Sequence, residues 1–261
     1  MKSVSFRYQT ELHFSSPAAK HRFLLKILPP ADNRQQIKQL SWQIEPTATV
    51  WKTLDGFGND ALSGYIDAAH EYFRFGIEGS AQVSGEPYTE RGQHTGALLY
   101  HTELTNPGAA IINFYNDAKQ SAPSGILSRI EHFSQAVNKC LRYEHGATTN
   151  ATAAQEAFDC GAGVCQDYAH ILLTLLRLDK IPCSYVAGLA SDYGETHAWV
   201  EAQISKGRFC GIDPTRNKLI DENYIALSRG RDFKDCSVER GVFKGACRGT
   251  QIVNLKMEVA Q

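Results

Sequence analysis

The segment GAGVCQDYAH, residues 161–170, leads into an apolar run, ILLTLL, at residues 171–176. Apolar side chains recur at helical spacing over Val164–Leu178, so this stretch predicts a largely buried helix. Cys165 falls in its first turn, behind two glycines that permit a tight approach. The helix dipole and the unsatisfied N–H groups of a first turn lower a thiol pKa. The segment therefore predicts a reactive thiolate.

Three strands are expected after this helix, at residues 183–189, 196–204 and 208–213, because Pro182 prevents the helix from continuing. The second strand alternates, with His197, Trp199 and Glu201 on one face. Ser205–Gly207 suggests a hairpin between the last two strands. If this loop has three residues, Asp213 lies opposite Trp199 and within side-chain reach of His197. A two-residue loop would place Asp213 on the opposite face.

These residues supply the parts of an acyl-transfer site. Cys165 would be the nucleophile, His197 the base that exchanges protons with it, and Asp213 the acceptor that orients the imidazole. An oxyanion site also needs donors, and the backbone N–H of Cys165 at a helix start is a natural one. Weaker candidates for a second donor are Gln155, Gln166 and Asn150.

Other polar residues near these motifs have two interpretations each. Gln166 and Trp199 are weak substrate-binding candidates, and Trp199 could equally be core. Asp167 and Glu201 could form ion pairs, line the cleft or lie on a solvated surface. His170 is off the helical face of Cys165, which favours a structural role.

Three blocks together resemble a known signature: GVCQDYAH at 163–170, HAWVE at 197–201 and GIDPT at 211–215. Their order and spacing are similar to those of the transglutaminase-like superfamily, and more closely to its bacterial members described as candidate cysteine proteases. RGRD at 229–232 and RGV at 240–242 are similar to the tail of that group. The resemblance implies a papain-like fold, a catalytic triad of Cys165, His197 and Asp213, and a β-rich region before the catalytic domain.

The first half reads as an all-β module with little chemistry. Residues 4–14 alternate apolar and polar side chains, and the pattern returns at 21–28 until Pro29-Pro30 stops it. Further strands are expected at 39–44, 49–54, 61–66, 71–77 and 81–84, with a turn at Asp55–Asn59. Such short strands favour an antiparallel β-sandwich. The histidines of this half stand isolated, which argues against a metal or catalytic role for His13, His21 and His70.

The fold class expected is α+β: a β-sandwich over residues 1–90, followed by a transglutaminase-like catalytic domain over 91–261 made of helices and an antiparallel sheet. Two further helices are expected at residues 126–141, capped by Ser124, and 152–158. Residues 98–104 and 109–114 suggest short elements. The tail after Asp221 could fold over the cleft, and the loop Ser191–Glu195 together with the β module could set specificity.

Composition narrows the class of protein. The 261 residues are 43% hydrophobic with a formal net charge of -1, which argues against a basic nucleic-acid surface. No apolar run is long enough to predict a membrane span, and the first residues alternate, unlike a signal peptide. Seven cysteines, an odd number, favour free thiols in a cytoplasmic protein. Six of them are expected to be small buried hydrophobes. No spacing predicts a metal site or a cofactor.

The sequence thus predicts a thiol-dependent peptidase or amidase that acts on a peptide or protein substrate through an acyl-enzyme on Cys165. A protein-glutamine transglutaminase, in which an amine replaces water as acceptor, shares the same triad and remains an alternative. A non-catalytic binding module with this fold is a third, although binding alone does not require Cys165, His197 and Asp213 together. The natural substrate and the oligomeric state cannot be read from the sequence.

Overall fold

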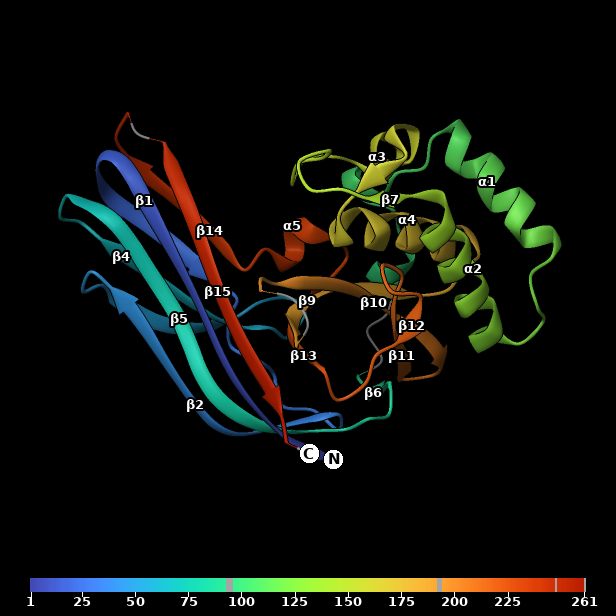
Figure 1. The fold of residues 1–261 in the computed structure, drawn as a ribbon, viewed down its shortest axis with the longest axis horizontal. Coiled ribbons are helices and arrows are strands. Elements are labelled where there is room, and N and C mark those ends of the chain that lie inside the picture. Colours follow the sequence, from blue (N-terminus) through green and yellow to red (C-terminus); the bar gives the residue numbers. More distant parts are fainter. Residues whose placement is uncertain (93–95, 192–193, 247, 261) are drawn as a thin grey trace.

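The computed structural model describes residues 1–92, 96–191, 194–246 and 248–260. Two lobes lie side by side (Figure 1): a β lobe in which the chain begins and ends, and a lobe with helices on one side of an antiparallel sheet. The α+β expectation is confirmed. Within the described residues, no helix is long and apolar enough to cross a membrane.

The β lobe is built around one long strand, β1 (Lys2–Leu25). Its first half pairs with β5 (His70–Val83), which in turn pairs with β2 (Gln35–Glu45). Its second half pairs with β4 (Asp60–Ile66), which pairs with β3 (Thr49–Leu54). The register shifts between His13 and Ala18, where the strand bends, so two expected strands merge into one. Inward side chains of both halves form a single apolar core.

Two strands from the end of the chain complete this lobe. β14 (Glu239–Lys244) and β15 (Gly249–Val259) both pair with β1, antiparallel. Figure 1 shows β15 running beside β1, with the two termini close together. The tail therefore does not cover the cleft, and the segment 91–261 contributes to both lobes. A division of the chain at residue 90 misplaces these strands, because β pairing joins segments that are far apart in sequence.

The second lobe contains a six-stranded sheet in the order β12-β11-β10-β9-β13, with β6 (Tyr88–Glu90) on β11. Its strands are β9 (Cys183–Ala190), β10 (His197–Ser205), β11 (Arg208–Asp213), β12 (Lys218–Leu219) and β13 (Tyr224–Gly230). The β10–β11 pairing runs from Gln203↔Phe209 to Val200↔Ile212. This is the register of the three-residue loop, which confirms that expectation.

Helices pack on one face of this sheet: α1 (Ala109–Gln120), α2 (Ile126–Cys140), α3 (Ala154–Cys160) and α4 (Cys165–Leu178). Short elements complete the lobe: the 3-10 turns η1 (Gly96–Leu99) and η2 (Glu103–Thr105), the strand pair β7 (Arg142–Tyr143) and β8 (Ala162–Gly163), and α5 (Phe233–Cys236). α1 is longer than the short element expected. Gly125, not Ser124, is the N-cap of α2, and no side chain caps it.

The six cysteines within the described ranges form no disulfide bond. Cys183, Cys210 and Cys236 are buried, as expected of small apolar residues. Cys160 is exposed at the end of α3, which the sequence interpretation missed, and Cys247 lies outside the described residues.

Candidate active site

His197 and Asp213 meet at the ends of adjacent strands. His197 begins β10 and Asp213 ends β11, and the histidine Nε2 lies 2.8 Å from the aspartate Oδ2. Both side chains are fully buried. A bond from Nε2–H to a carboxylate fixes the tautomer of the imidazole, which leaves the proton-exchange role to Nδ1. The side-chain contact expected from the hairpin register is confirmed.

Asp213 is held on several sides. Its Oδ2 also accepts the hydroxyl of Tyr224 at 2.8 Å, and its Oδ1 accepts the backbone N–H groups of Thr215 and Arg216 at 2.9 and 3.3 Å. Burial alone would raise the pKa of this carboxyl, but hydrogen bonds from His197, Tyr224 and the backbone hold it below its usual range. Asp213 is therefore an anion at neutral pH.

Tyr224 is the site residue that sequence reasoning missed. It begins β13, and its hydroxyl also accepts Arg216 Nη1 at 3.1 Å. Its pKa is raised well above the ordinary value by burial and by the neighbouring Asp213 carboxylate, so the phenol stays protonated and donates. No motif marked Tyr224, because it reaches Asp213 only through the pairing of β13 with β9.

Cys165 is the first residue of α4, as expected, and its sulfur accepts the backbone N–H groups of Ala198 and Gln166. Ala198 follows His197 directly, so the thiol lies beside the start of β10. The expectation of a lowered thiol pKa is wrong for the unliganded site. Desolvation of the sulfur raises the pKa of the Cys165 thiol to about 12 and outweighs the two N–H groups. The resting group is a thiol that needs a base.

The two weak substrate-binding candidates are placed differently. Trp199 is completely buried and packs edge-on against Tyr224, with ring centroids 5.4 Å apart, so it supports the core and presents no surface to a substrate. Gln166 is nearly buried next to Cys165, and its Nε2 lies 3.3 Å from the backbone carbonyl of Asn150. Its role as an oxyanion donor stays a prediction.

Gln155, the other side-chain candidate for that role, belongs to a different contact. Its carboxamide accepts the Ile111 N–H at 3.3 Å and donates to Asp159 at 2.8 Å, between α1 and α3. His170 is buried, and its Nε2 accepts the backbone N–H of Phe233 at 3.2 Å. The structural interpretation of His170 agrees with this contact.

Neither acidic neighbour of the motifs is on a solvated surface. Asp167 is buried and accepts the backbone N–H of Val164 and the hydroxyl of Thr148, each at 2.7 Å, which fixes the turn before Cys165. Glu201 is buried and receives both Nε and Nη2 of Arg229, at 2.9 and 3.0 Å. This second pair lies where the two lobes meet, because Arg229 also contacts Asp32 at 2.9 Å.

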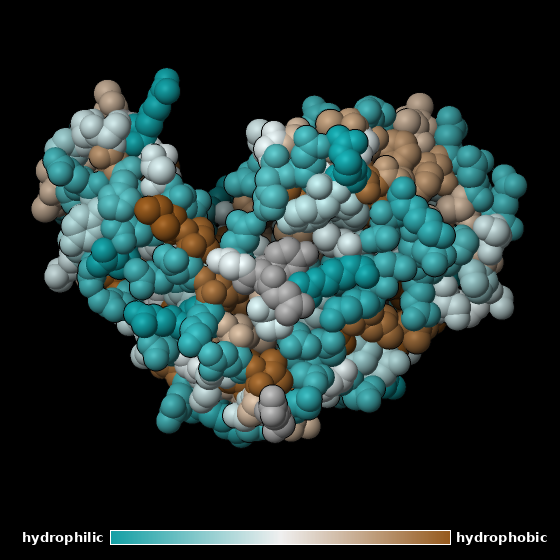
Figure 2. Space-filling model, viewed as in Figure 1, coloured by the Kyte–Doolittle hydropathy of each residue, from teal (hydrophilic) through white to brown (hydrophobic). Residues whose placement is uncertain are grey.

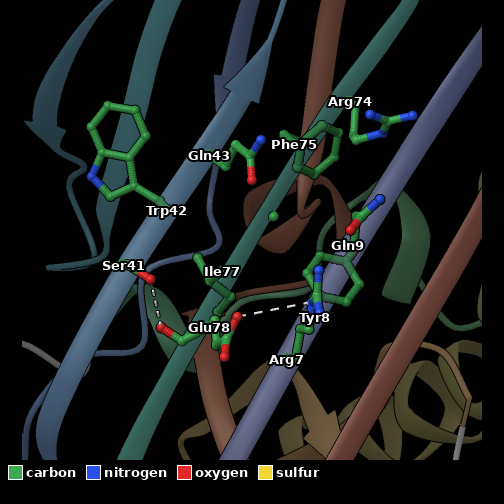
Figure 3. Close-up of a pocket in the computed structure, with 11 residues that line it drawn as sticks. Arg7, Tyr8, Gln9, Ser41, Trp42, Gln43, Arg74, Phe75, Ile77 and Glu78 are labelled. Carbon is green, nitrogen blue, oxygen red and sulfur yellow. Dashed lines mark hydrogen bonds and ion pairs between the residues drawn. The ribbon is translucent and has the colours of Figure 1, made fainter.

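A cavity of about 370 Å³ lies on the β lobe, away from these residues. In Figure 3 the side chains of Arg7, Gln9, Gln43 and Arg74 surround a hollow over β1, β2 and β5. Gly76 opens this hollow, since a Cβ there would lie 2.5 Å from the Tyr8 carbonyl. The charged side chains around it are paired with one another or with neighbouring carboxylates, so the surface is a solvated polar face.

Among the described residues, no group of three histidine, cysteine or acidic side chains is placed to hold a metal ion. Figure 2 shows one face of the molecule hollowed between the two lobes, with hydrophobic residues gathered along the β-lobe side of the hollow. Of the loop expected to set specificity, Asp192 and Tyr193 lie outside the described residues.

Two family models match the chain. The transglutaminase-like superfamily core matches residues 114–214, and the bacterial transglutaminase-like N-terminal region matches residues 4–83. The first match contains Cys165, His197 and Asp213, and the two together span more than half of the chain. The chain belongs to the transglutaminase-like superfamily.

Its relatives include an uncharacterized protein of Mycobacterium tuberculosis (strain H37Rv), 28% identical over 90% of this chain and 85% of the relative. An uncharacterized protein of Mycobacterium leprae is 24% identical over 97% of each chain. Among solved structures, a "Putative Cysteine Protease" from Cytophaga hutchinsonii superposes with a TM-score of 0.79 at 16% identity, covering 100% of this chain and 92% of that chain. The last likeness establishes the fold.

Proposed function

We propose that the protein is a thiol-dependent acyl-transfer enzyme, a cysteine peptidase or amidase that cleaves peptide or glutamine-type amide bonds. The observation that carries this proposal is the buried His197–Asp213 pair, 2.8 Å from Nε2 to Oδ2, beside a thiol at a helix start. The Cys165 sulfur is linked to the same strand end by the Ala198 N–H. A binding module has no need of this combination.

Acylation follows from these positions. The Cys165 thiol gives its proton to His197 Nδ1 as the sulfur attacks the amide carbonyl carbon. The backbone N–H of Cys165 stabilises the developing oxyanion. His197 then gives the proton to the departing nitrogen as the C–N bond breaks, which leaves a thioester on Cys165 and a free amine. Asp213 stabilises the imidazolium that exists between these two proton transfers.

Deacylation reuses the same base. His197 Nδ1 takes a proton from water, the hydroxide attacks the thioester carbonyl, and the proton returns to the Cys165 sulfur as the acid leaves. A primary amine in place of water would make a new amide and complete a transamidation. The two reactions share every residue named here, and they differ in what reaches the thioester.

The test offers a glutamine-containing peptide with and without a primary amine, and measures ammonia release and peptide masses. We expect hydrolysis products in both cases and none with Cys165→Ala. Incorporation of the amine as the main product would replace the hydrolase by a transglutaminase. Equal turnover by Cys165→Ala would remove the thiol from the reaction altogether.

A further inference from the structure

The strand β13 is an edge strand of the second lobe, and side chains of the β lobe occupy its open edge. β9 pairs with one side of β13. On the other side Gln35 makes two reciprocal bonds with one residue: its Nε2 donates to the Ala226 carbonyl at 3.0 Å, and its Oε1 accepts the Ala226 N–H at 2.8 Å. The carboxamide thus takes the place of a neighbouring strand.

Asn59 repeats the arrangement further along. Its Nδ2 donates to the Arg229 carbonyl at 2.7 Å, and its Oδ1 accepts the Arg229 N–H at 2.8 Å. Arg34 binds the beginning of the strand, since its Nη1 donates to the Tyr224 carbonyl at 2.8 Å and its Nη2 to the Asp221 carbonyl. Gln35, Arg34 and Asn59 are all almost completely buried. Each belongs to the β lobe and grips only backbone of the second lobe.

The strand gripped in this way carries the residue that holds Asp213. Tyr224 is the first residue of β13, and its hydroxyl donates to the same Oδ2 that accepts His197 Nε2. A shift of the β13 backbone therefore displaces the Tyr224 phenol from the carboxylate. The pairing of β13 with β9 is interrupted between Ala226 and Ser228, so the ladder alone fixes this strand less firmly.

We infer that Gln35, Asn59 and Arg34 are positioning residues of the active site. They fix β13 so that Tyr224 holds Asp213 against His197, and the β lobe is thereby a working part of the catalytic unit. This role rests on the proposed function only in assigning His197 as the base for Cys165. A buried amide that satisfies both polar groups of a strand residue also explains why two polar side chains lie in this interface at all.

The test measures the alkylation rate of Cys165 by iodoacetamide across pH, with the labelled cysteine located by mass spectrometry. This readout needs no substrate, so it stands even if amide hydrolysis is not the natural reaction. The variants are Gln35→Met, Tyr224→Phe and both together. Gln36→Met is the matched control, because Gln36 is the exposed neighbour on the same strand. Gln35→Glu, which keeps the acceptor for the Ala226 N–H, is the milder second variant.

At pH 7 we expect Gln35→Met to slow alkylation of Cys165 by about tenfold, the scale of a displacement below 1 Å in a catalytic group. Gln36→Met leaves the rate unchanged, and Gln35→Glu falls between. The double variant should react within twofold of Tyr224→Phe, because Gln35 acts through Tyr224. Independent, multiplying effects overturn the inference. So does an unchanged rate in folded Gln35→Met or, if that variant does not fold, in Gln35→Glu.

Discussion

The Trp199 indole lies directly over Gly188, and no side chain fits between them. A Cβ on Gly188 would lie 2.3 Å from Trp199 Cη2 and 2.3 Å from the Ile225 carbonyl oxygen. Gly188 pairs with His197 on one side and with Ala226 on the other. The base and the strand of Tyr224 are thus spaced by a residue without a side chain, and Trp199 fills the space in front of it.

Gly188→Ala should accordingly damage both the fold and the site. We expect a loss of about 1–3 kcal/mol in the free energy of unfolding, because both the indole and a backbone carbonyl must move. Urea unfolding followed by fluorescence measures this. Gly56→Ala is the control, since nothing lies within 4 Å of its added Cβ. Equal stability of the two variants would mean that the contact with Trp199 is not as tight as described.

Asp213→Asn should lower the rate of amide hydrolysis roughly a hundredfold or more, the scale of general acid–base catalysis. The neutral amide neither stabilises the imidazolium nor holds the same tautomer. Its remaining oxygen still accepts the N–H groups of Thr215 and Arg216, so circular dichroism should show a folded protein. Steady-state kinetics with full activity would exclude Asp213 from the mechanism.

The pH dependence of Cys165 reactivity separates the thiol from its base. In the unmodified protein the imidazole of His197 takes the proton, so we expect alkylation near neutral pH. In His197→Ala the reaction should require alkaline pH, because desolvation raises the pKa of the Cys165 thiol to about 12. Iodoacetamide kinetics between pH 6 and pH 10 measure both profiles. Superimposable profiles would show that His197 does not act on this thiol.

The same labelling experiment has an internal control. Cys160 is exposed, whereas Cys183 and Cys210 are buried. Labelling of Cys160 should follow the pH equally in both proteins, because this thiol lies outside the site. A change at Cys160 in His197→Ala would indicate altered folding instead of a lost base.

The β lobe should lose stability in mild acid through a histidine pair. His21 Nδ1 lies 3.2 Å from His70 Nε2, and burial, then the neighbouring His70, lowers the pKa of His21 to about 4. Below pH 6.5 the unfolded chain binds a proton that the folded chain refuses, so stability falls as the pH drops from 6.5 towards 4. Allowing for solvent screening, the loss is about 1–2 kcal/mol.

His21→Phe should flatten this part of the stability curve, because phenylalanine cannot bind the proton and the site is lined by Phe14, Phe23 and Phe73. Urea unfolding at pH 7 and pH 4.5 gives the two free energies, with exposed His145→Phe as the control. The contribution of the nearby buried Glu239 cancels in the comparison, since every variant retains it. An unchanged slope with His21→Phe would assign the acid sensitivity to other groups.

Much of the candidate site could be predicted because its parts are local. A helix start places Cys165, and a hairpin whose loop length sets the register brings Asp213 to His197; both depend on residues close in sequence. Tyr224 could not be found in this way, since its strand joins the sheet on the far side of β9. The thiol pKa was predicted in the wrong direction, because helix position is visible in sequence and desolvation is not.

The sequence by itself determined the strands, the helices and the pairing of His197 with Asp213, because hydrophobic period and loop length act over a few residues. Only the tertiary structure decided that β14 and β15 return to β1, that His21 meets His70, and that Gln35 and Asn59 close the edge of β13. These contacts join segments separated by tens to hundreds of residues. What selects them is the burial of one shared core and the satisfaction of buried backbone groups, neither of which leaves a local pattern.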